Sequence, residues 1–436
     1  MRKSDIIIIG CGPGGMEAAS IALSKGLDTV VIERDEPGGT CLNRGCIPTK
    51  ALCSSADIIS SLKESAAFGV KVDGVTLSYA DAVARKEAVI GDLRANVAAM
   101  MSRATYVKGE ARFVSADTVA VGDEEYSAPK IIIATGSATA MLPIPGAELS
   151  ITSDDVLSLS ELPEKIAIIG GGVIGMELAC ILNAFGVKVT VLEYCKEVLP
   201  NFDRDIAKRL HSLLSRRGIE IITSAQVTSI APGKKVGYTA KGKEMSVDAD
   251  EVVMAVGRRP VVPEGAEAVG VNLHRGAVVI DEAMQSSVPG VYAIGDVNAK
   301  MMLAHVASAQ AISAMGGKVN LNVVPSAVFT SPECSMVGIT EEQCKEQGID
   351  YAAAKSLFRS NGKAMAMGEP DGMVKMIIDK STRKILGCHI CGAHAADLIQ
   401  EVATVMSSGL AVDAVTETIH AHPTLGEVVH AVASSL

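Results

Sequence analysis

The sequence predicts an α/β fold built on parallel sheets, and two observations lead to this prediction. Short runs rich in isoleucine and valine, such as Asp5–Ile9, Lys130–Ala134 and Lys165–Ile169, are typical of buried parallel strands. An arrangement of strand, glycine turn, helix and second strand also occurs twice, with its first glycines 160 residues apart. The 436 residues are enough for several domains.

The first copy of this arrangement begins with Asp5–Ile9 and continues as Gly10-x-Gly12-x-x-Gly15. A helical pattern then runs to about Lys25, and the strand Asp28–Ile32 ends at Glu33. Glycines at this spacing form a tight turn and let the backbone approach a pyrophosphate, which the N-terminus of the helix binds. Glu33 is placed to bond a ribose hydroxyl. The pattern predicts a Rossmann-like dinucleotide-binding domain.

The second copy begins with Lys165–Ile169, continues as Gly170-x-Gly172-x-x-Gly175, and ends at Glu193 after the strand Lys188–Leu192. Each glutamate follows the first glycine of its copy by 23 residues. An acid at this position favours a free 2′-hydroxyl over a 2′-phosphate. The next residues, 194–197, include no arginine pair to hold a phosphate, so we expect NAD rather than NADP.

Two cysteines, Cys41 and Cys46, lie just beyond the first copy, with Gly45 and Pro48 on either side of the second one. On a regular helix five residues rise about 7.5 Å, whereas a disulfide needs its Cα atoms within about 7 Å. The pair can therefore close only where the backbone departs from a helix, which glycine and proline allow. A dithiol, a flavin and a nicotinamide each carry two electrons, so the first nucleotide is expected to be FAD.

Composition restricts the remaining function classes. The net charge is −10, so nucleic acid is not an expected partner. Ten cysteines are scattered along the chain, as in a protein of the reducing cytoplasm, and the N-terminus has no signal-peptide pattern. The apolar window 166–187 is long enough to cross a bilayer, but its glycine run favours a buried strand, turn and helix.

The sequence 388–391, Cys-His-Ile-Cys, is the nearest approach to a metal motif. It lies in an alternating strand pattern, so its two cysteines are expected on opposite faces, and no second pair follows at a zinc-like spacing. We therefore expect no metal site. Cys334 is interpreted as an ordinary small apolar position.

With these motifs, the chain resembles the pyridine nucleotide–disulfide oxidoreductases, and within them the dihydrolipoamide dehydrogenase branch. The resemblance covers nearly the whole chain. It is carried by the segments 10–15, 38–50, 134–136, 170–177, 257–260, 290–296 and 420–427. The branch oxidises protein-bound dihydrolipoyl groups and reduces NAD⁺ by way of FAD.

The resemblance implies four segments. An FAD-binding domain would span 1–145 and an NAD-binding domain 146–257. A central segment, 258–322, would return to the FAD domain, and a C-terminal α+β dimerisation domain would span 323–436. The expected fold is therefore two Rossmann-like domains plus this dimerisation domain.

The resemblance also implies which residues hold the cofactors. For FAD they are Gly10, Gly12, Pro13, Gly14, Gly15, Glu33, Arg34, Gly39, Thr40, Cys41, Lys50, Ala111, Thr135, Gly136, Asp296, Ala304 and His305. For NAD they are Gly170, Gly172, Val173, Ile174, Gly175, Glu193, Val227, Gly257 and Arg258.

The catalytic residues implied by the resemblance are Cys41, Cys46, His422, Glu427, Lys50 and Glu177. Cys46 would face the flavin, and Cys41 would exchange with substrate. His422 would be the acid–base, because imidazole titrates near neutral pH, and Glu427 would orient it. Lys50 would pair with Glu177, since a glutamate in that apolar helix needs a cation or a proton.

In the family this histidine reaches the disulfide of the other subunit, so a homodimer with shared active sites is expected. The partner would be the lipoyl-bearing carrier protein of a 2-oxoacid dehydrogenase or glycine cleavage complex. Two departures from the family pattern are Arg44, where many relatives have an apolar residue, and a C-terminus only nine residues beyond Glu427.

Two other functions stay open. One is NAD(P)H-dependent reduction of another low-molecular-weight disulfide. The other is a non-catalytic assembly subunit of a multienzyme complex, although Cys41, Cys46, Lys50 and His422 argue against it.

Overall fold

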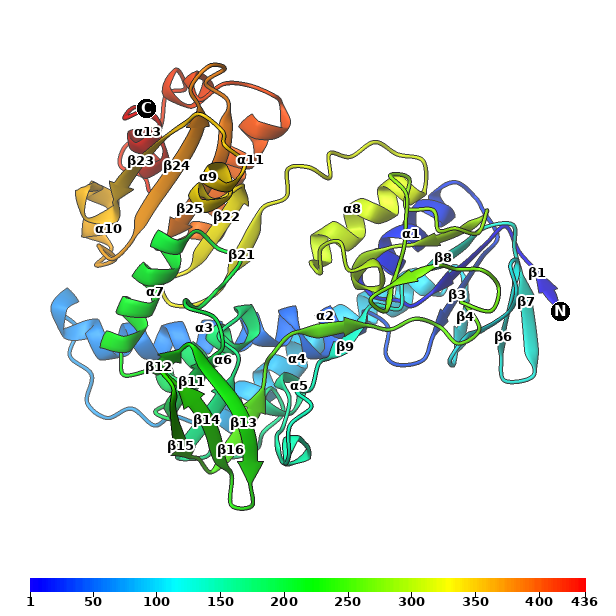
Figure 1. The fold of residues 1–436 in the computed structure, drawn as a ribbon, viewed down its shortest axis with the longest axis horizontal. Coiled ribbons are helices and arrows are strands. Elements are labelled where there is room, and N and C mark those ends of the chain that lie inside the picture. Colours follow the sequence, from blue (N-terminus) through cyan, green and yellow to red (C-terminus); the bar gives the residue numbers. More distant parts are fainter. The chain divides into compact units, whose positions relative to one another are not determined.

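The computed structural model describes residues 1–436, which divide into two compact units (Figure 1). The first unit comprises residues 1–51, 81–140 and 257–321. The second comprises residues 52–80, 141–256 and 322–436. The first of the boundaries between them along the chain falls inside one long helix, α3 (Cys46–Glu64).

The first unit is built on a five-stranded parallel sheet in the order β20-β8-β2-β3-β4. Its strands are β2 (Ile6–Ile9), β3 (Thr29–Glu33), β4 (Thr105–Lys108), β8 (Ile131–Ile133) and β20 (Val291–Ala293). The central strands are fully buried, as their unbroken runs of isoleucine and valine predict. Strand β20 brings a distant part of the chain back to this sheet.

Helices α1 (Pro13–Ser24) and α8 (Ala304–Ala314) pack side by side in this unit (Figure 1). Their contact is close: a Cβ on Gly14 would come within 3.1 Å of the Ala307 carbonyl oxygen. The unit also contains α2 (Gly39–Arg44), α4 (Tyr79–Met101) and η3 (Gly295–Asn298). Smaller sheets are formed by β1 (Arg2–Lys3), β5 (Arg112–Ser115), β6 (Thr118–Val121) and β7 (Glu124–Ser127), by β9 (Ser137–Thr139) with β17 (Arg258–Pro260), and by β18 (Leu273–His274) with β19 (Ala277–Val278).

The second unit repeats the parallel arrangement in a four-stranded sheet with the order β12-β11-β10-β16. Its strands are β10 (Lys165–Ile169), β11 (Lys188–Glu193), β12 (Glu220–Thr223) and β16 (Glu251–Met254). Helices α6 (Val173–Ala184) and α7 (Arg204–Arg216) belong to this part. An antiparallel sheet of β13 (Ala225–Ala231), β14 (Lys235–Ala240) and β15 (Lys243–Asp248) follows. The short elements are η1 (Ser65–Phe68), η2 (Ala147–Leu149) and α5 (Ser153–Val156).

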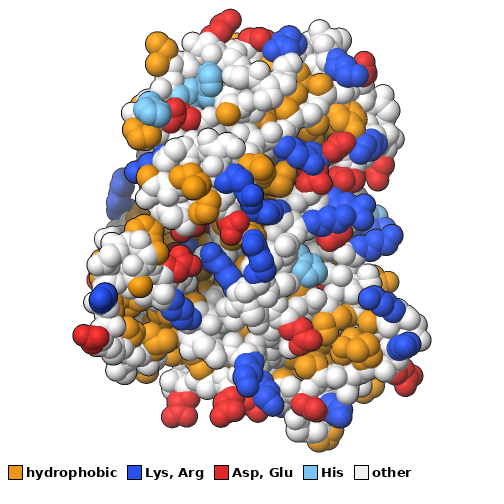
Figure 2. Space-filling model, turned by 90° about the vertical axis from the view of Figure 1, so that its left-hand side faces the viewer, with side chains coloured by type: hydrophobic (Ala, Val, Ile, Leu, Met, Phe, Trp, Pro, Cys, Tyr) orange, Lys and Arg blue, Asp and Glu red, His pale blue; other side chains and the backbone are white.

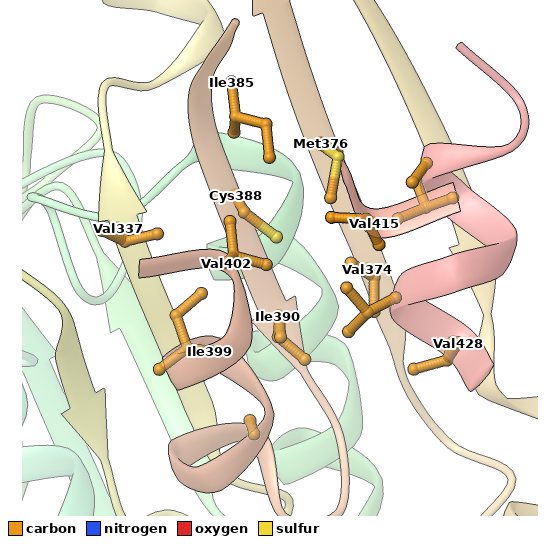
Figure 3. Packing of buried hydrophobic residues seen from close by; sticks show 14 of the residues in the cluster. Val337, Val374, Met376, Ile385, Cys388, Ile390, Ile399, Val402, Val415 and Val428 are labelled. Atoms are coloured by element: carbon orange, nitrogen blue, oxygen red, sulfur yellow. The ribbon is translucent and has the colours of Figure 1, made fainter. Parts of the chain in front are cut away.

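The C-terminal part of the second unit is an antiparallel sheet in the order β21-β22-β25-β24-β23. Its strands are β21 (Ser326–Val328), β22 (Cys334–Gly338), β23 (Tyr351–Leu357), β24 (Met373–Asp379) and β25 (Ile385–Cys391). One face carries an apolar cluster that includes Val337, Val374, Cys388 and Ile390, packed with residues of α11 (Ala395–Ser407) and α13 (Glu427–Ala433) (Figure 3). The other elements are α9 (Glu341–Glu346), η4 (Phe358–Ser360), α10 (Gly362–Ala366) and α12 (Asp413–Thr416).

A buried charge lies on the opposite face of this sheet. The side chain of Lys375 in β24 is 1% exposed, and its Nζ lies 2.9 Å from Asp203, 2.7 Å from Asp205 and 2.7 Å from Glu341. Asp203 caps the N-terminus of α7 by accepting a hydrogen bond from the Asp205 N–H. Lys375 therefore ties α7 and the start of α9 to the sheet.

The apolar window 166–187 does not form one long helix. It is divided among β10, the glycine turn and α6, as the sequence predicts. No helix of the structure combines the length and the apolar composition needed to cross a bilayer. On the face drawn in Figure 2, acidic and basic side chains are interspersed rather than gathered by sign.

Candidate active site

Two glycine turns, one in each unit, lie where a central parallel strand ends. Strand β2 has β8 on one side and β3 on the other, and β10 is likewise flanked by β16 and β11. The strand order reverses at these points, and ligands of such sheets bind beyond the carboxyl ends of the strands there. Helices α1 and α6 begin after Gly12 and Gly172, and neither has a side-chain cap. Their first N–H groups are therefore directed toward an anion site.

Close backbone approaches explain the glycines of both turns. A Cβ on Gly15 would collide with the Gly10 carbonyl oxygen, and a Cβ on Gly175 with that of Gly170. Gly39, with φ of +59°, lies against Gly12, so that a Cβ there would come within 2.7 Å of the Gly12 Cα. The turn of the first unit is thus lined by bare backbone, which fits a pyrophosphate.

The glutamates that end the second strand of each copy make matching hydrogen bonds. Glu33 accepts from the N–H of Cys11 at 2.7 Å and of Asp35 at 2.8 Å. Glu193 accepts from the N–H of Gly171 at 2.5 Å and of Cys195 at 2.6 Å. Both carboxylates are buried, and each keeps lone pairs that could accept from a ribose hydroxyl.

The first unit also gathers several of the other residues expected around FAD. Ser137 donates to Asp296 at 2.5 Å, and the Arg258 Nε donates to the Ser137 Oγ at 2.7 Å. The Thr135 Oγ1 donates to the carbonyl of Val261 at 2.5 Å. Strand β9 is thereby joined to β17 across a sequence separation of about 120 residues. Gly257 and Arg258, expected at the NAD site, belong to the first unit with Asp296 rather than to the second unit with Glu193.

The remaining residues expected at the FAD site occupy defined places in the first unit. Ala111 is buried beside the sheet, and Ala304 and His305 open α8. Pro13 is in the first turn of α1 and Thr40 in α2. Arg34 forms an exposed ion pair with Glu110 at 3.0 Å.

Cys41 and Cys46 lie on either side of a break between two helices. Helix α2 ends at Arg44, the following Gly45 has φ of −138° and ψ of −109°, far from helical, and α3 begins at Cys46. The expected departure from regular helix is therefore confirmed. The neighbouring Cys46 thiol, and then burial, raise the pKa of Cys41, while the Cys46 N–H and the Lys50 cation lower it.

Asn43 supports this cysteine loop and was not singled out by the sequence analysis. Its side-chain amide donates to the carbonyls of Pro37 at 3.1 Å and Gly39 at 2.9 Å, and its oxygen accepts from the Arg94 Nε at 2.9 Å. Arg44 forms an ion pair with Asp35 and lowers the pKa of that carboxyl. No motif signals these roles, because the partners come from α4 and from the preceding loop.

In the second unit, Glu177 is buried in α6, and its Oε1 accepts from the N–H of Phe329 at 2.9 Å. Val227 in β13 packs in one cluster with Ile169 and Leu192, at the carboxyl ends of β10 and β11. Val173 and Ile174 form the first turn of α6. The expected pairing of Glu177 with Lys50 stays a prediction.

His422, on the loop before α13, lies beside Glu427, the first residue of that helix. The His422 Nδ1 is 2.9 Å from the Glu427 Oε1, while the Glu427 Oε2 accepts from the Thr424 N–H at 2.9 Å. Both hydrogen bonds lower the pKa of Glu427, and the bond from the Thr424 N–H has the larger effect. Glu427 therefore stays ionised. The His422 side chain is 78% exposed, and the peptide bond to Pro423 is cis. His420 makes its own pair with Glu401 at 2.9 Å.

Comparison with known proteins agrees with this arrangement. Residues 4–311 match the pyridine nucleotide-disulphide oxidoreductase family, and residues 324–433 match its dimerisation domain. The dihydrolipoyl dehydrogenase of Geobacillus stearothermophilus is 38% identical over 98% of this chain and 94% of the relative. That of Bacillus subtilis is 38% identical over 98% of this chain and 95% of the relative.

The structure is also similar to solved structures of the same kind. A copper(II) complex of RclA, the HOCl-induced flavoprotein disulfide reductase of Escherichia coli, matches with a TM-score of 0.88 and 30% identity, covering 100% of both chains. With two glycine turns, a cysteine pair and a matching C-terminal sheet, this chain belongs to the pyridine nucleotide-disulphide oxidoreductases.

Proposed function

We propose that the chain is a dihydrolipoyl dehydrogenase that oxidises protein-bound dihydrolipoyl groups, with FAD in the first unit and NAD in the second. The observation that carries the proposal is the Cys41/Cys46 pair, held across a helix break just beyond the first strand–turn–helix–strand copy. The 38% identity to dihydrolipoyl dehydrogenases over nearly the whole chain supports this choice within the family.

The cysteines would act by thiol–disulfide exchange. His422 takes the proton of one dihydrolipoyl thiol, and the resulting thiolate attacks Cys41 of the Cys41–Cys46 disulfide, so that Cys46 leaves as thiolate. The second thiol of the dihydrolipoyl group then attacks the lipoyl sulfur that is bonded to Cys41. This closes the lipoyl disulfide and releases Cys41 as a thiol. When bound, FAD and NAD⁺ would supply the capacity to take the electron pair from the reduced cysteines.

The acid–base pair is suited to that exchange. Glu427 is fixed by the Thr424 N–H and accepts from the His422 Nδ1, so the Nε2 of the imidazole is left for the substrate thiol. We also propose that Lys50 pairs with Glu177 near the flavin. Asp296, presented by η3 and bonded to Ser137, would bond the ribitol.

For the second nucleotide we propose NAD. Arg204 is the first arginine after Glu193 in the sequence, and its Nε already pairs with Glu197 at 3.3 Å. A 2′-phosphate would therefore be repelled by the Glu193 carboxylate, and no free arginine from this stretch would be there to bind it.

The active form proposed is a cytoplasmic homodimer with shared active sites, and the substrate is the lipoyl-bearing carrier of a 2-oxoacid dehydrogenase or glycine cleavage complex. The match of residues 324–433 to a dimerisation domain supports the dimer. The loop that carries His422 lies at the surface, where Ile419 is 96% exposed, so the imidazole is accessible to another subunit.

Anaerobic reduction of the purified flavoprotein tests the assignment. Dihydrolipoamide should produce a long-wavelength charge-transfer band, and added NAD⁺ should then be reduced. Turnover of NADPH with glutathione disulfide, without any reaction with dihydrolipoamide, would contradict it and favour a reductase of another disulfide, the kind of activity that the name of RclA states.

A pair of variants tests the role of the cysteines. Cys46→Ser should keep FAD and lose dihydrolipoamide-dependent NADH formation. Cys53→Ser is the matched control, because Cys53 lies on the same helix α3 two turns further on, and it should keep that activity. Full activity of Cys46→Ser would refute the role given to the pair.

A further inference from the structure

Cys334 and Cys391 lie directly opposite each other on the antiparallel strands β22 and β25. The Gly392 N–H donates to the Glu333 carbonyl at 2.9 Å. The backbone hydrogen bonds are therefore made by the residues that flank the two cysteines and not between the cysteines themselves. The cysteines are thus a non-hydrogen-bonded pair, in which Cα atoms approach to about 4.5 Å. Disulfides form at Cα separations of about 4.4–6.8 Å, so the backbone already has the spacing of a disulfide.

The side chains are placed for the same bond. Residues directly opposite each other in an antiparallel pair point to the same face. The two thiols are close enough that Cys391 contributes to the raised pKa of Cys334, and both cysteines are fully buried. Cys388, three residues before Cys391 on β25, points to the other face and into the apolar cluster (Figure 3). Each sulfur therefore has one partner on its own face of this strand pair.

A cavity of about 160 Å³ in the second unit lies beside the segment that leads into β22. It is lined by Cys53, Cys180, Arg217 and Ser331, among others, and Ser331 is three residues before Cys334. A small oxidant could approach the start of β22 by this route. Burial, followed by the contact with Cys391, raises the pKa of Cys334, so little thiolate is present and oxidation is slow.

We propose that Cys334 and Cys391 are a second redox pair, which forms a cross-strand disulfide on oxidation by a peroxide. Hydrogen peroxide oxidises one thiol to a sulfenic acid and leaves as water. The other thiol attacks that sulfur, the S–S bond forms, and a second water is released. Two thiols and one hydrogen peroxide thus give one disulfide and two waters, and an external dithiol reverses the change.

The bond would join β22 to β25 and close a loop of about 57 residues within the segment that matches the dimerisation domain. Oxidation should therefore raise the thermal midpoint of this segment, because the unfolded chain loses freedom. This effect is separate from turnover at Cys41 and Cys46.

Thiol counting in a Cys41→Ser/Cys46→Ser background tests the proposal. Two of the ten cysteines are removed, so eight thiols remain. Folded protein is treated with hydrogen peroxide, then denatured, alkylated, and digested without reduction for mass spectrometry. We expect six thiols, a peptide linked through Cys334 and Cys391, and a higher melting midpoint that dithiothreitol reverses.

Variants in the same background give the controls. Cys388→Ala should form the same linked peptide and show the same rise in the melting midpoint as its parent, because Cys388 faces the apolar cluster. Cys334→Ala should keep its remaining thiols, form no linked peptide and show no rise in the midpoint. Eight free thiols in the treated parent, a linkage through Cys388, or irreversible oxidation of Cys334 without linkage would each overturn the proposal. The linked peptide of the parent decides the matter even if an alanine variant does not fold.

Discussion

Replacement of Lys375 by methionine should destabilise the second unit by about 3–5 kcal/mol, the cost of removing one partner of a buried ion pair. The Lys375 and Asp203 side chains are 1% and 0% exposed, so water cannot replace the lost cation. Asp203 would still accept hydrogen bonds from the N–H of Asp205 at 3.0 Å and from the N–H of Glu341 at 3.3 Å. Its charge would no longer be balanced.

Urea unfolding, followed by circular dichroism, measures this loss as a lower midpoint. Lys380→Met is the matched control, because Lys380 is on the turn after the same strand and its 2.6 Å pair with Asp350 is exposed. An exposed pair contributes about 0–1 kcal/mol. The double variant Lys375→Met/Asp203→Asn should recover part of the loss, since it removes the unbalanced charge and keeps a capping side chain. The reasoning is refuted if Lys375→Met costs no more than Lys380→Met.

The same cluster predicts a change in acid stability. The side chain of Lys345, and then that of Lys375, lower the pKa of Glu341 from 4.5 to about 2. Ionised Glu341 therefore stabilises the fold above pH 4.5, and this contribution is lost as the pH falls toward 2. Without Lys375 one of the two cations is missing, so acid unfolding should begin at a higher pH than in the wild type.

Three substitutions test the two nucleotide turns and the acid–base pair. Gly15→Ala places a Cβ against the Gly10 carbonyl, so the purified protein should contain little FAD by absorbance. Gly175→Ala makes the equivalent collision in the second copy, so FAD should be retained while the KM for NAD⁺ rises. Equal loss of FAD in both variants would contradict separate sites for the two nucleotides. Glu427→Gln should lower kcat by about 10²-fold or more at unchanged FAD content, and wild-type kcat would show that the carboxylate is not needed.

Local patterns predict the two nucleotide-binding copies well. Strand, glycine turn, helix and strand follow one another within about 30 residues, and β2, α1 and β3 lie where the sequence places them. The break at Gly45 was also predictable, since it follows from helix geometry and the residues near Cys46.

Contacts between distant segments were not predictable in the same way. The network of Ser137, Arg258 and Asp296 depends on strands β9 and β17 pairing across about 120 residues, and no periodicity signals that register. Cys334 was interpreted as an ordinary apolar position, and only the β22/β25 register reveals Cys391 opposite it. Lys375 likewise gives no sign of burial in the sequence, because two of its three partners, Asp203 and Asp205, are about 170 residues away.

The matching hydrogen bonds of Glu33 and Glu193 have a thermodynamic consequence for ligand binding. Each carboxylate is held by two backbone N–H groups, so its rotameric freedom is already lost when the protein folds. A ribose that binds there does not have to immobilise the side chain, and more of the interaction energy appears as affinity. Aspartate would be one methylene too short to reach both amides from the same backbone. Substitution by aspartate should therefore weaken binding through added mobility, even though the charge is preserved.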